Sequence, residues 1–169
     1  MSQLSEYMAD ALKGSRDIMN GAMDGVSAEQ AAKAPGGSAN SIASLYVHAV
    51  FDEDALISMA AGKESLWASG WKEKVGGSDS MGLTLDDATK AYAFDPDKFS
   101  QYAQAVADSS DATIRAFSDA DLERKVDMGD FGAPSVAEIV RDFVTWHYAF
   151  HSGEVSSQKG VMGLQGIPF

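Results

Sequence analysis

Cysteine is absent from this chain of 169 residues. Its absence excludes disulfide bonds, thiolate metal ligands and a cysteine nucleophile, so any sulfur chemistry needs a sulfur atom from a cosubstrate. The apolar runs are only a few residues long, whereas a helix that crosses a bilayer needs about 20. The opening residues, MSQLSEYMADALKG, are acidic and lack the apolar core of a signal peptide. We therefore expect a cytoplasmic protein with no membrane partner.

Basic residues are also few. The chain carries 13 lysine and arginine residues against 25 aspartate and glutamate residues, a formal charge of −12. Binding to nucleic acid depends on basic clusters that neutralise phosphates, and the sequence has no basic run. The acidic balance also repels anionic substrates unless a bound cation inverts the local field. We expect a small-molecule substrate and no nucleic-acid partner.

The sequence shows no convincing alternation of apolar and polar residues of the kind that marks a strand. Its apolar residues recur with helical periodicity instead. The length favours one domain over residues 1–169. Apolar stripes with a helical repeat cover residues 4–25, 41–61, 96–117 and 135–163. The sequence therefore predicts an all-α four-helix bundle with a long connection, residues 63–95, between its second and third helices.

Several residues mark where these helices begin. Ser38 or Asn40 is a plausible N-cap for the second helix, and Pro96 suits the first position of the third. Ser135 and Glu138 have the spacing of a capping box at the start of the last helix. In the connection, the sequence TLDD predicts a short helix over residues 84–92. Connections of this length often form lids or extra packing layers.

The chain has three histidines, and all three fall in apolar helical segments. His147 and His151 are four residues apart, which places their Cβ atoms roughly 5–6 Å apart on one helix face. Two such imidazoles can bind one ion at a Zn–N distance of about 2.0–2.1 Å. His48 from a facing helix would complete a three-histidine metal site with open coordination positions. A purely structural role, with the imidazoles hydrogen-bonded in the core, is the alternative.

Two carboxylates accompany the histidines. Glu154 follows His151 by three residues and shares its helix face, while Asp52 lies four residues after His48. Each is a candidate catalytic base, a fourth ligand or a hydrogen-bond acceptor for a histidine ring. The alternative for both is a solvated helix carboxylate. Tyr148 stands where a zincin metalloprotease of the H-E-x-x-H type carries its glutamate, which disfavours that class.

Aromatic residues surround both candidate regions. Trp67 and Trp71, in the long connection, either line a substrate cavity or pack on the outside of the bundle. Trp146, Tyr148 and Phe150 flank the paired histidines, and we expect them in the core.

Residues 147–155 read HYAFHSGEV, and the chain closes on GLQGIPF. This ending resembles the DinB-like (DinB/YfiT) superfamily, in which the last helix carries H-x-x-x-H-x-G-[QE]-[IV] and helix two supplies a partner histidine, here His48. The resemblance implies an up-down-down-up bundle, often a homodimer, with Zn or Ni held by His48, His147 and His151. It also implies a transferase that activates a low-molecular-weight thiol such as bacillithiol or mycothiol, while some members resemble hydrolases.

Three functional interpretations follow. The preferred one is a metal-dependent enzyme that activates a thiol cosubstrate for transfer, and hydrolysis by an activated water is the second. The third is a non-catalytic stress protein that binds a metal or a small ligand. It predicts a closed metal shell, completed by Glu154 or Asp52, with no adjoining pocket.

Overall fold

The computed structural model describes residues 2–81, 83–85 and 87–167, and this part of the chain is all-α. It contains no β-strand, apart from one isolated bridge between Lys125 and Ser135. The long helices are α1 (Gln3–Met23), α3 (Ile42–Ala61), α6 (Pro96–Ala116) and α9 (Trp146–Val161). The short ones are α2 (Ala28–Ala32), α4 (Lys72–Val75), α5 (Asp87–Ala91), α7 (Asp119–Glu123) and α8 (Val136–Glu138). Two π-helical turns, η1 (Trp67–Trp71) and η3 (Ile139–Thr145), and a 3₁₀ turn, η2 (Gly129–Phe131), complete the order.

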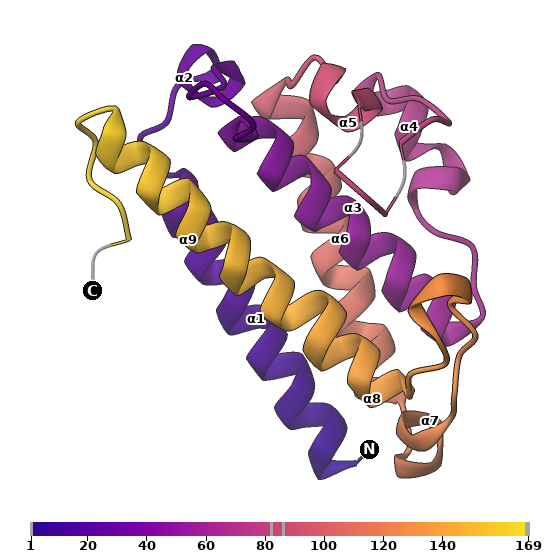
Figure 1. Cartoon of the computed structure of the whole chain (residues 1–169). Coiled ribbons are helices and arrows are strands. Elements are labelled where there is room, and N and C mark those ends of the chain that lie inside the picture. Colours follow the sequence, from indigo (N-terminus) through magenta and orange to yellow (C-terminus); the bar gives the residue numbers. More distant parts are fainter. Residues whose placement is uncertain (1, 82, 86, 168–169) are drawn as a thin grey trace.

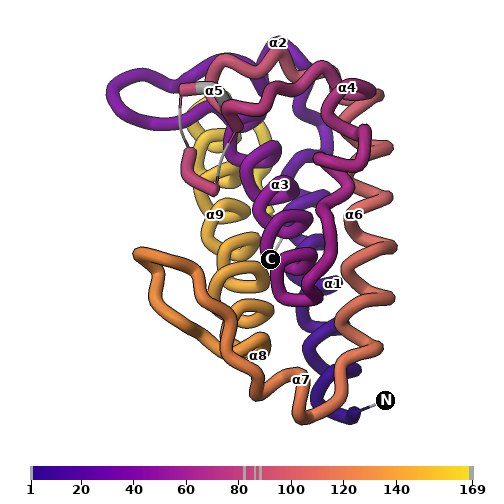
Figure 2. The backbone as a smooth tube through the Cα atoms, turned by 90° about the vertical axis from the view of Figure 1, so that its right-hand side faces the viewer, coloured from indigo at the N-terminus to yellow at the C-terminus, as the bar shows by residue number. Residues whose placement is uncertain are grey.

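The long helices form a ring. Helix α1 packs on α9 and α6, and α3 packs on the same two helices from the other side. Figure 1 shows α1 running up, α3 and α6 running down, and α9 running up again beside α1. Figure 2 shows the hairpin-like loop before α8 standing out beside the lower part of α9. Two cavities open on opposite sides of this ring, one between α3 and α9 and one between α1 and α6.

The predicted helix starts are largely confirmed, with one correction. Ser41, and neither Ser38 nor Asn40, caps α3, because its side chain accepts the N–H of Ser44. Asp95 caps α6 ahead of Pro96. The Ser135–Glu138 capping box is present, and it opens α8, which continues through η3 into α9.

Three short helices, α2, α4 and α7, were not predicted. Both α2 and α7 begin with a capping box, formed by Ser27 with Gln30 and by Ser118 with Asp121. The short helix predicted over residues 84–92 is present as α5, Asp87–Ala91. Helices of five residues bury too little surface to show an apolar stripe, so periodicity alone does not reveal them.

The first half of the long connection is anchored to the bundle by Asp54. Its carboxylate accepts the backbone N–H groups of Leu66 at 2.9 Å and Trp67 at 2.8 Å, and the hydroxyl of Tyr102 at 2.7 Å. The Trp67 ring packs edge-on against Phe51. Of the two roles considered for Trp67, packing against the outer surface of the bundle is therefore the one observed.

A buried ionic network joins all four long helices. Glu53 on α3 accepts Nη1 of Arg16 from α1 at 2.6 Å and the hydroxyl of Tyr148 from α9 at 2.8 Å. Arg16 also pairs with Asp111 on α6. Burial raises the pKa of the Glu53 carboxyl, and the Arg16 charge opposes that rise. Because a buried charge is costly without a partner, the network fixes how the four helices meet.

Candidate metal centre

The fold brings His48, His147 and His151 together in the groove between α3 and α9. One nitrogen from each ring can be chosen so that the three atoms lie within 4.8 Å of one another. The His48 side chain is 7% exposed, and those of His147 and His151 are 19% and 14% exposed. The cluster is thus half-enclosed, with an opening on the His147 and His151 side.

The paired imidazoles of α9 point at one another. The Nε2 atoms of His147 and His151 lie 2.6 Å apart. Burial and the neighbouring imidazoles lower the pKa of His147 to about 3, and burial also lowers the pKa of His151. Both rings are therefore neutral near pH 7, which is the protonation state of a metal-binding imidazole.

A carboxylate oxygen lies within 3.5 Å of Nδ1 of each ring. Oδ1 of Asp52 is 3.3 Å from Nδ1 of His48, and its Oδ2 is 3.5 Å from Nδ1 of His147. Oε2 of Glu154 is 2.5 Å from Nδ1 of His151. Metal-bound histidines usually have such a partner, because it fixes the tautomer and leaves the other nitrogen free for the ion.

The two carboxylates differ in environment. Asp52 is buried, and burial raises the pKa of its carboxyl to about 6 against the opposing charge of His48. The side chain of Glu154 is 54% exposed. Although Nδ1 of His48 and Oδ1 of Asp52 are buried and close together, their geometry gives neither atom a hydrogen bond. Buried polar atoms without partners are typical of sites that bind an ion or a water molecule.

The π-helical turn η3 ends at Thr145, two residues before His147. Thr145 bridges it by donating its hydroxyl to the carbonyl of Val140 at 2.8 Å. A π turn holds one more residue than an α turn, so it rotates the residues after it relative to those before. This rotation helps to set where His147 and His151 face, and a regular helical repeat cannot reveal it.

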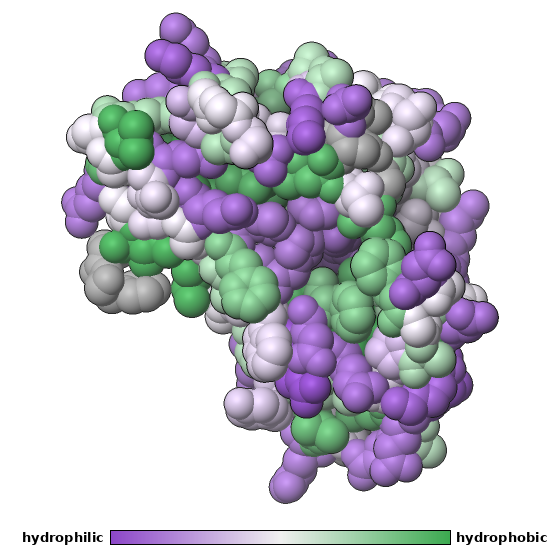
Figure 3. Space-filling model, in the orientation of Figure 1, coloured by the Kyte–Doolittle hydropathy of each residue, from purple (hydrophilic) through white to green (hydrophobic). Residues whose placement is uncertain are grey.

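A cavity of about 180 Å³ adjoins His48, Asp52 and His147. Its remaining walls are largely apolar, and they come from α3, the long connection, the loop before α8, and η3. They are formed by Leu56, Leu83, Met128, Phe131, Asp142 and Phe143. In Figure 3 this face of the molecule is hollowed between α3 and α9, with hydrophilic residues at the bottom of the hollow.

Some of these wall residues were not predicted from the sequence. Met128 and Phe131 lie in the glycine-containing loop before α8, and Phe131 is 57% exposed. The sequence feature that could have indicated Phe131 is a large aromatic residue in an otherwise polar loop. Within the described part of the chain, Leu83 is the residue of the 63–95 connection that lines this cavity. The connection therefore forms part of the cavity wall.

The prediction that Trp146 and Phe150 are core residues is wrong. Their exposed fractions are 50% and 66%, whereas Tyr148 is buried as predicted. An apolar stripe does not distinguish a helix face that meets the core from one that faces solvent.

The donor set fits a divalent transition-metal ion. Three imidazoles suit Zn and neighbouring metals, and the carboxylates lie beside the rings where they can orient them. None of the helices in the described residues is both long and apolar enough to cross a membrane. The all-α fold and the three-histidine cluster together fit a metal-binding protein.

The chain belongs to the DinB superfamily, whose family model matches residues 11–155. In fold it is similar to the crystal structure of a conserved protein from Enterococcus faecalis, with a TM-score of 0.78 and 16% sequence identity. That similarity covers 96% of this chain and 99% of the other. Among curated proteins, none matches the sequence significantly.

Proposed function

We propose that this protein is a metal-dependent enzyme acting on a small molecule, with His48, His147 and His151 holding Zn or Ni. One observation carries the proposal: three ring nitrogens gather within 4.8 Å, and two of these rings line a cavity of about 180 Å³. That volume is below the roughly 300–1,000 Å³ typical of drug-sized ligands, so it suits a small substrate.

Transfer of a low-molecular-weight thiol is the preferred reaction. When bound, the ion lowers the pKa of a thiol or water in its open position. The apolar walls at Leu56, Met128 and Phe143 hold the apolar part of an electrophile. In the transfer, the thiol sulfur forms a bond to the electrophilic carbon, the leaving group departs with the electrons of its own bond, and the thiol proton moves to a base.

The chain offers Asp52 as that base. It lines the same cavity and contacts His48 and His147, so it can both orient the rings and accept a proton. Glu154 is assigned to orient His151, because its carboxylate contacts the ring on the side away from His147. The thiol comes from a cosubstrate, such as bacillithiol or mycothiol, because the chain has no cysteine.

Hydrolysis through an activated water is the second candidate and uses the same residues. A non-catalytic protein would have a metal shell closed by Asp52 or Glu154 with no adjoining pocket. The cavity beside His48 and His147 supports the catalytic interpretation over that one.

The test compares the two reactions in one preparation. Zinc-loaded protein is given a small thiol with 1-chloro-2,4-dinitrobenzene, or 4-nitrophenyl acetate alone, and the coloured product is followed. We expect zinc-dependent thioether formation that is lost in His147→Ala, with the ester turned over more slowly. Glu29→Gln, an exposed change on α2, serves as the control. Rates in the His147→Ala variant or in zinc-free protein that equal the rate of the zinc-loaded parent protein would contradict the proposal.

A further inference from the structure

The hairpin-like loop of residues 124–135 forms one wall of the histidine cavity. Its two arms are joined by a backbone hydrogen bond of 2.8 Å from the N–H of Met128 to the carbonyl of Gly132, and by another of 2.9 Å nearer the bundle. Met128 and Phe131 both line the cavity. Figure 2 shows the loop standing out from the bundle beside α9. The loop therefore has a regular shape of its own, and its tip meets the cavity.

Glycine residues on both sides of Phe131 fix the backbone that carries it. Gly129 and Gly132 have φ angles of 61° and 80°, in the left-handed region that favours glycine. Gly132 also has a ψ angle of −152°, a combination that is essentially restricted to glycine. The ring of Phe131 packs edge-on against that of Phe143, with centroids 6.3 Å apart and planes at 86°. Phe131 therefore has a defined position at the cavity, although its side chain is largely exposed.

The size and chemistry of this end of the cavity suit an aromatic ring. Phe131 and Phe143 can pack edge-on or offset against a further ring, and the thioether of Met128 makes favourable contacts with ring edges. The volume of about 180 Å³ is close to the roughly 150 Å³ of an apolar cavity that holds one benzene molecule. A single aromatic ring therefore fills the available space.

The charges at the cavity favour an uncharged ring. Of the residues that line it in the described part of the chain, none is a lysine or an arginine. Its two carboxylates are already engaged, Asp52 beside the imidazoles and Asp142 with Arg141 at 2.5 and 2.7 Å. An anionic substituent on the ring would therefore meet carboxylates, with no basic side chain on the cavity wall to bind it.

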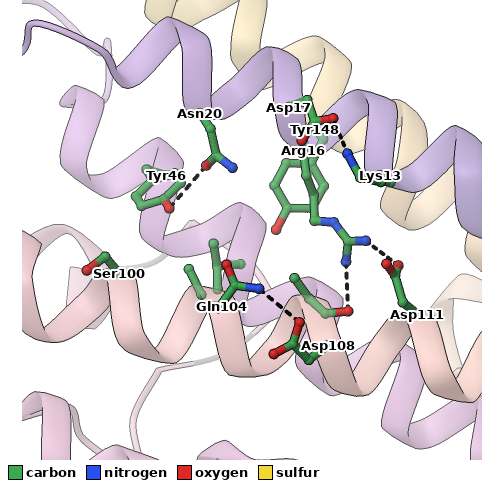
Figure 4. A pocket seen from close by; sticks show the side chains of 13 residues that line it. Lys13, Arg16, Asp17, Asn20, Tyr46, Ser100, Gln104, Asp108, Asp111 and Tyr148 are labelled. Carbon is green, nitrogen blue, oxygen red and sulfur yellow. Dashed lines mark hydrogen bonds and ion pairs between the residues drawn. The ribbon is translucent and has the colours of Figure 1, made fainter.

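The larger cavity between α1 and α6, of about 500 Å³, has a different character. Most of the side chains that line it are polar, and Ala103 and Ala107 leave space on the α6 side. Figure 4 shows its charged groups turned toward one another, with Arg16 reaching Asp111. A ring bound there would lie against paired charges, so the histidine cavity is the better site for an apolar ring.

We propose that Phe131 is a specificity-determining residue, which makes the metal centre select an uncharged electrophile that carries an aromatic ring. The ring lies against Phe131, Phe143 and Met128, and the reactive carbon lies on the side of the histidines. This selection rests on the proposed metal-dependent function and specifies the class of its substrate. A saturated substrate of the same size buries a similar apolar area but lacks the contacts between rings.

The experiment compares three hydroxamates, which bind a metal through the same group and differ in what that group carries. Acetohydroxamate has a methyl group, cyclohexanecarbohydroxamate a saturated ring and benzohydroxamate an aromatic ring. Isothermal titration calorimetry with zinc-loaded, full-length protein at pH 7 gives the dissociation constants. Because contacts between aromatic rings add to the burial of apolar area, benzohydroxamate should bind about fivefold more tightly than cyclohexanecarbohydroxamate. Equal or tighter binding of the saturated ring would overturn the proposal.

Two matched variants assign this preference to one residue. Phe131→Leu keeps an apolar side chain but removes the ring, so the preference for benzohydroxamate should fall to about twofold or less. Its zinc content and its affinity for acetohydroxamate should stay unchanged. Phe150→Leu is the control, because Phe150 is exposed on α9 and does not line the cavity. A preference that is unchanged in Phe131→Leu, or that falls equally in Phe150→Leu, would overturn the role of Phe131.

Failure of the metal centre would give a different result from failure of this selection. If none of the hydroxamates binds in a zinc-dependent manner, the proposed function is refuted and the selection with it. If all three bind only in the presence of zinc and without a preference for the aromatic ring, the metal centre stands and the role of Phe131 is refuted.

Discussion

The hydroxyl of Tyr148 donates a hydrogen bond of 2.8 Å to Oε2 of Glu53, across the contact between α9 and α3. Tyr148 directly follows His147, and Glu53 directly follows Asp52. Successive residues of a helix point about 100° apart. On both helices, therefore, one residue points to the histidine site and the next points to the ionic network. The network that holds the bundle together therefore also fixes the backbone that carries the metal centre.

Removal of the Glu53 side chain is expected to destabilise the fold strongly. Glu53→Ala leaves Arg16 buried with Asp111 as its remaining carboxylate partner, which should cost about 3–5 kcal/mol in unfolding free energy. Glu53→Gln keeps an acceptor for Tyr148 and should cost less. The measurement is urea unfolding at pH 7. The double variant Arg16→Met with Glu53→Leu should recover part of the loss, and a Glu53→Ala variant as stable as the parent protein would refute the role of the network.

The carboxylates behind the histidine rings should control metal affinity without being required for folding. Asp52→Asn and Glu154→Gln each replace a charged acceptor with a neutral amide, so zinc affinity should fall by roughly 10–100-fold. Asp52→Asn should have the larger effect, because Asp52 is buried and contacts two rings. Competition against a chromophoric chelator measures the affinity, with Glu29→Gln as the control of equal charge change. An unchanged affinity in both variants would show that these contacts do not position the ligands.

The capping box at the start of α8 predicts a stability difference that depends on pH. Hydrogen bonds from the backbone and side chain of Ser135 lower the pKa of Glu138 to about 2, from 4.5 for the free side chain. A carboxyl with a depressed pKa in the folded state contributes stability above its unfolded pKa and loses it as the pH falls through its folded pKa. Glu138→Ala should therefore be less stable than the parent protein at pH 6.

That difference should shrink as the pH falls from about 4.5 towards 2. Urea midpoints of both proteins at pH 6, 4.5 and 3.5 provide the comparison. A difference that is constant across these three values would show that the charged carboxylate of Glu138 is not what stabilises the cap.

Asp54 is expected to be the anchor of the connection between α3 and α6. Its carboxylate accepts two backbone N–H groups and the hydroxyl of Tyr102. Asp54→Ala leaves these buried donors without a partner, and each unsatisfied donor costs about 1–3 kcal/mol. Tyr102→Phe removes one of the three bonds and should cost about 1 kcal/mol. Hydrogen exchange at the amides of Leu66 and Trp67 should quicken in Asp54→Ala and not in Tyr102→Phe.

The parts of the fold that sequence predicts are those determined locally. The long helices were predicted because each has an apolar stripe and a polar or proline start, as at Pro96 and Ser135. The spacing of His147 and His151 placed them on one helix face for the same reason. His48 lies against them because α3 packs on α9. The sequence indicated this packing only through the apolar segment around His48 and the family resemblance.

The remaining features arise from contacts between distant segments. The π turn before His147 breaks the regular repeat without a distinctive residue. Phe131 enters the wall of the histidine cavity because the loop before α8 lies beside η3, a matter of tertiary packing. The α1–α6 cavity likewise depends on alanines of one helix facing polar residues of another. No pattern within either helix indicates it.

The most direct test of the central claim is the metal content of protein purified without a histidine tag. Wild-type protein and the triple His48, His147 and His151→Ala variant are dialysed against excess Zn²⁺ or Ni²⁺, passed through a desalting column and measured by elemental analysis. We predict close to one equivalent of metal in the wild type and almost none in the variant, with both proteins folded. Equal metal content in the two proteins, or none in either, would contradict the assignment of these histidines as a metal centre.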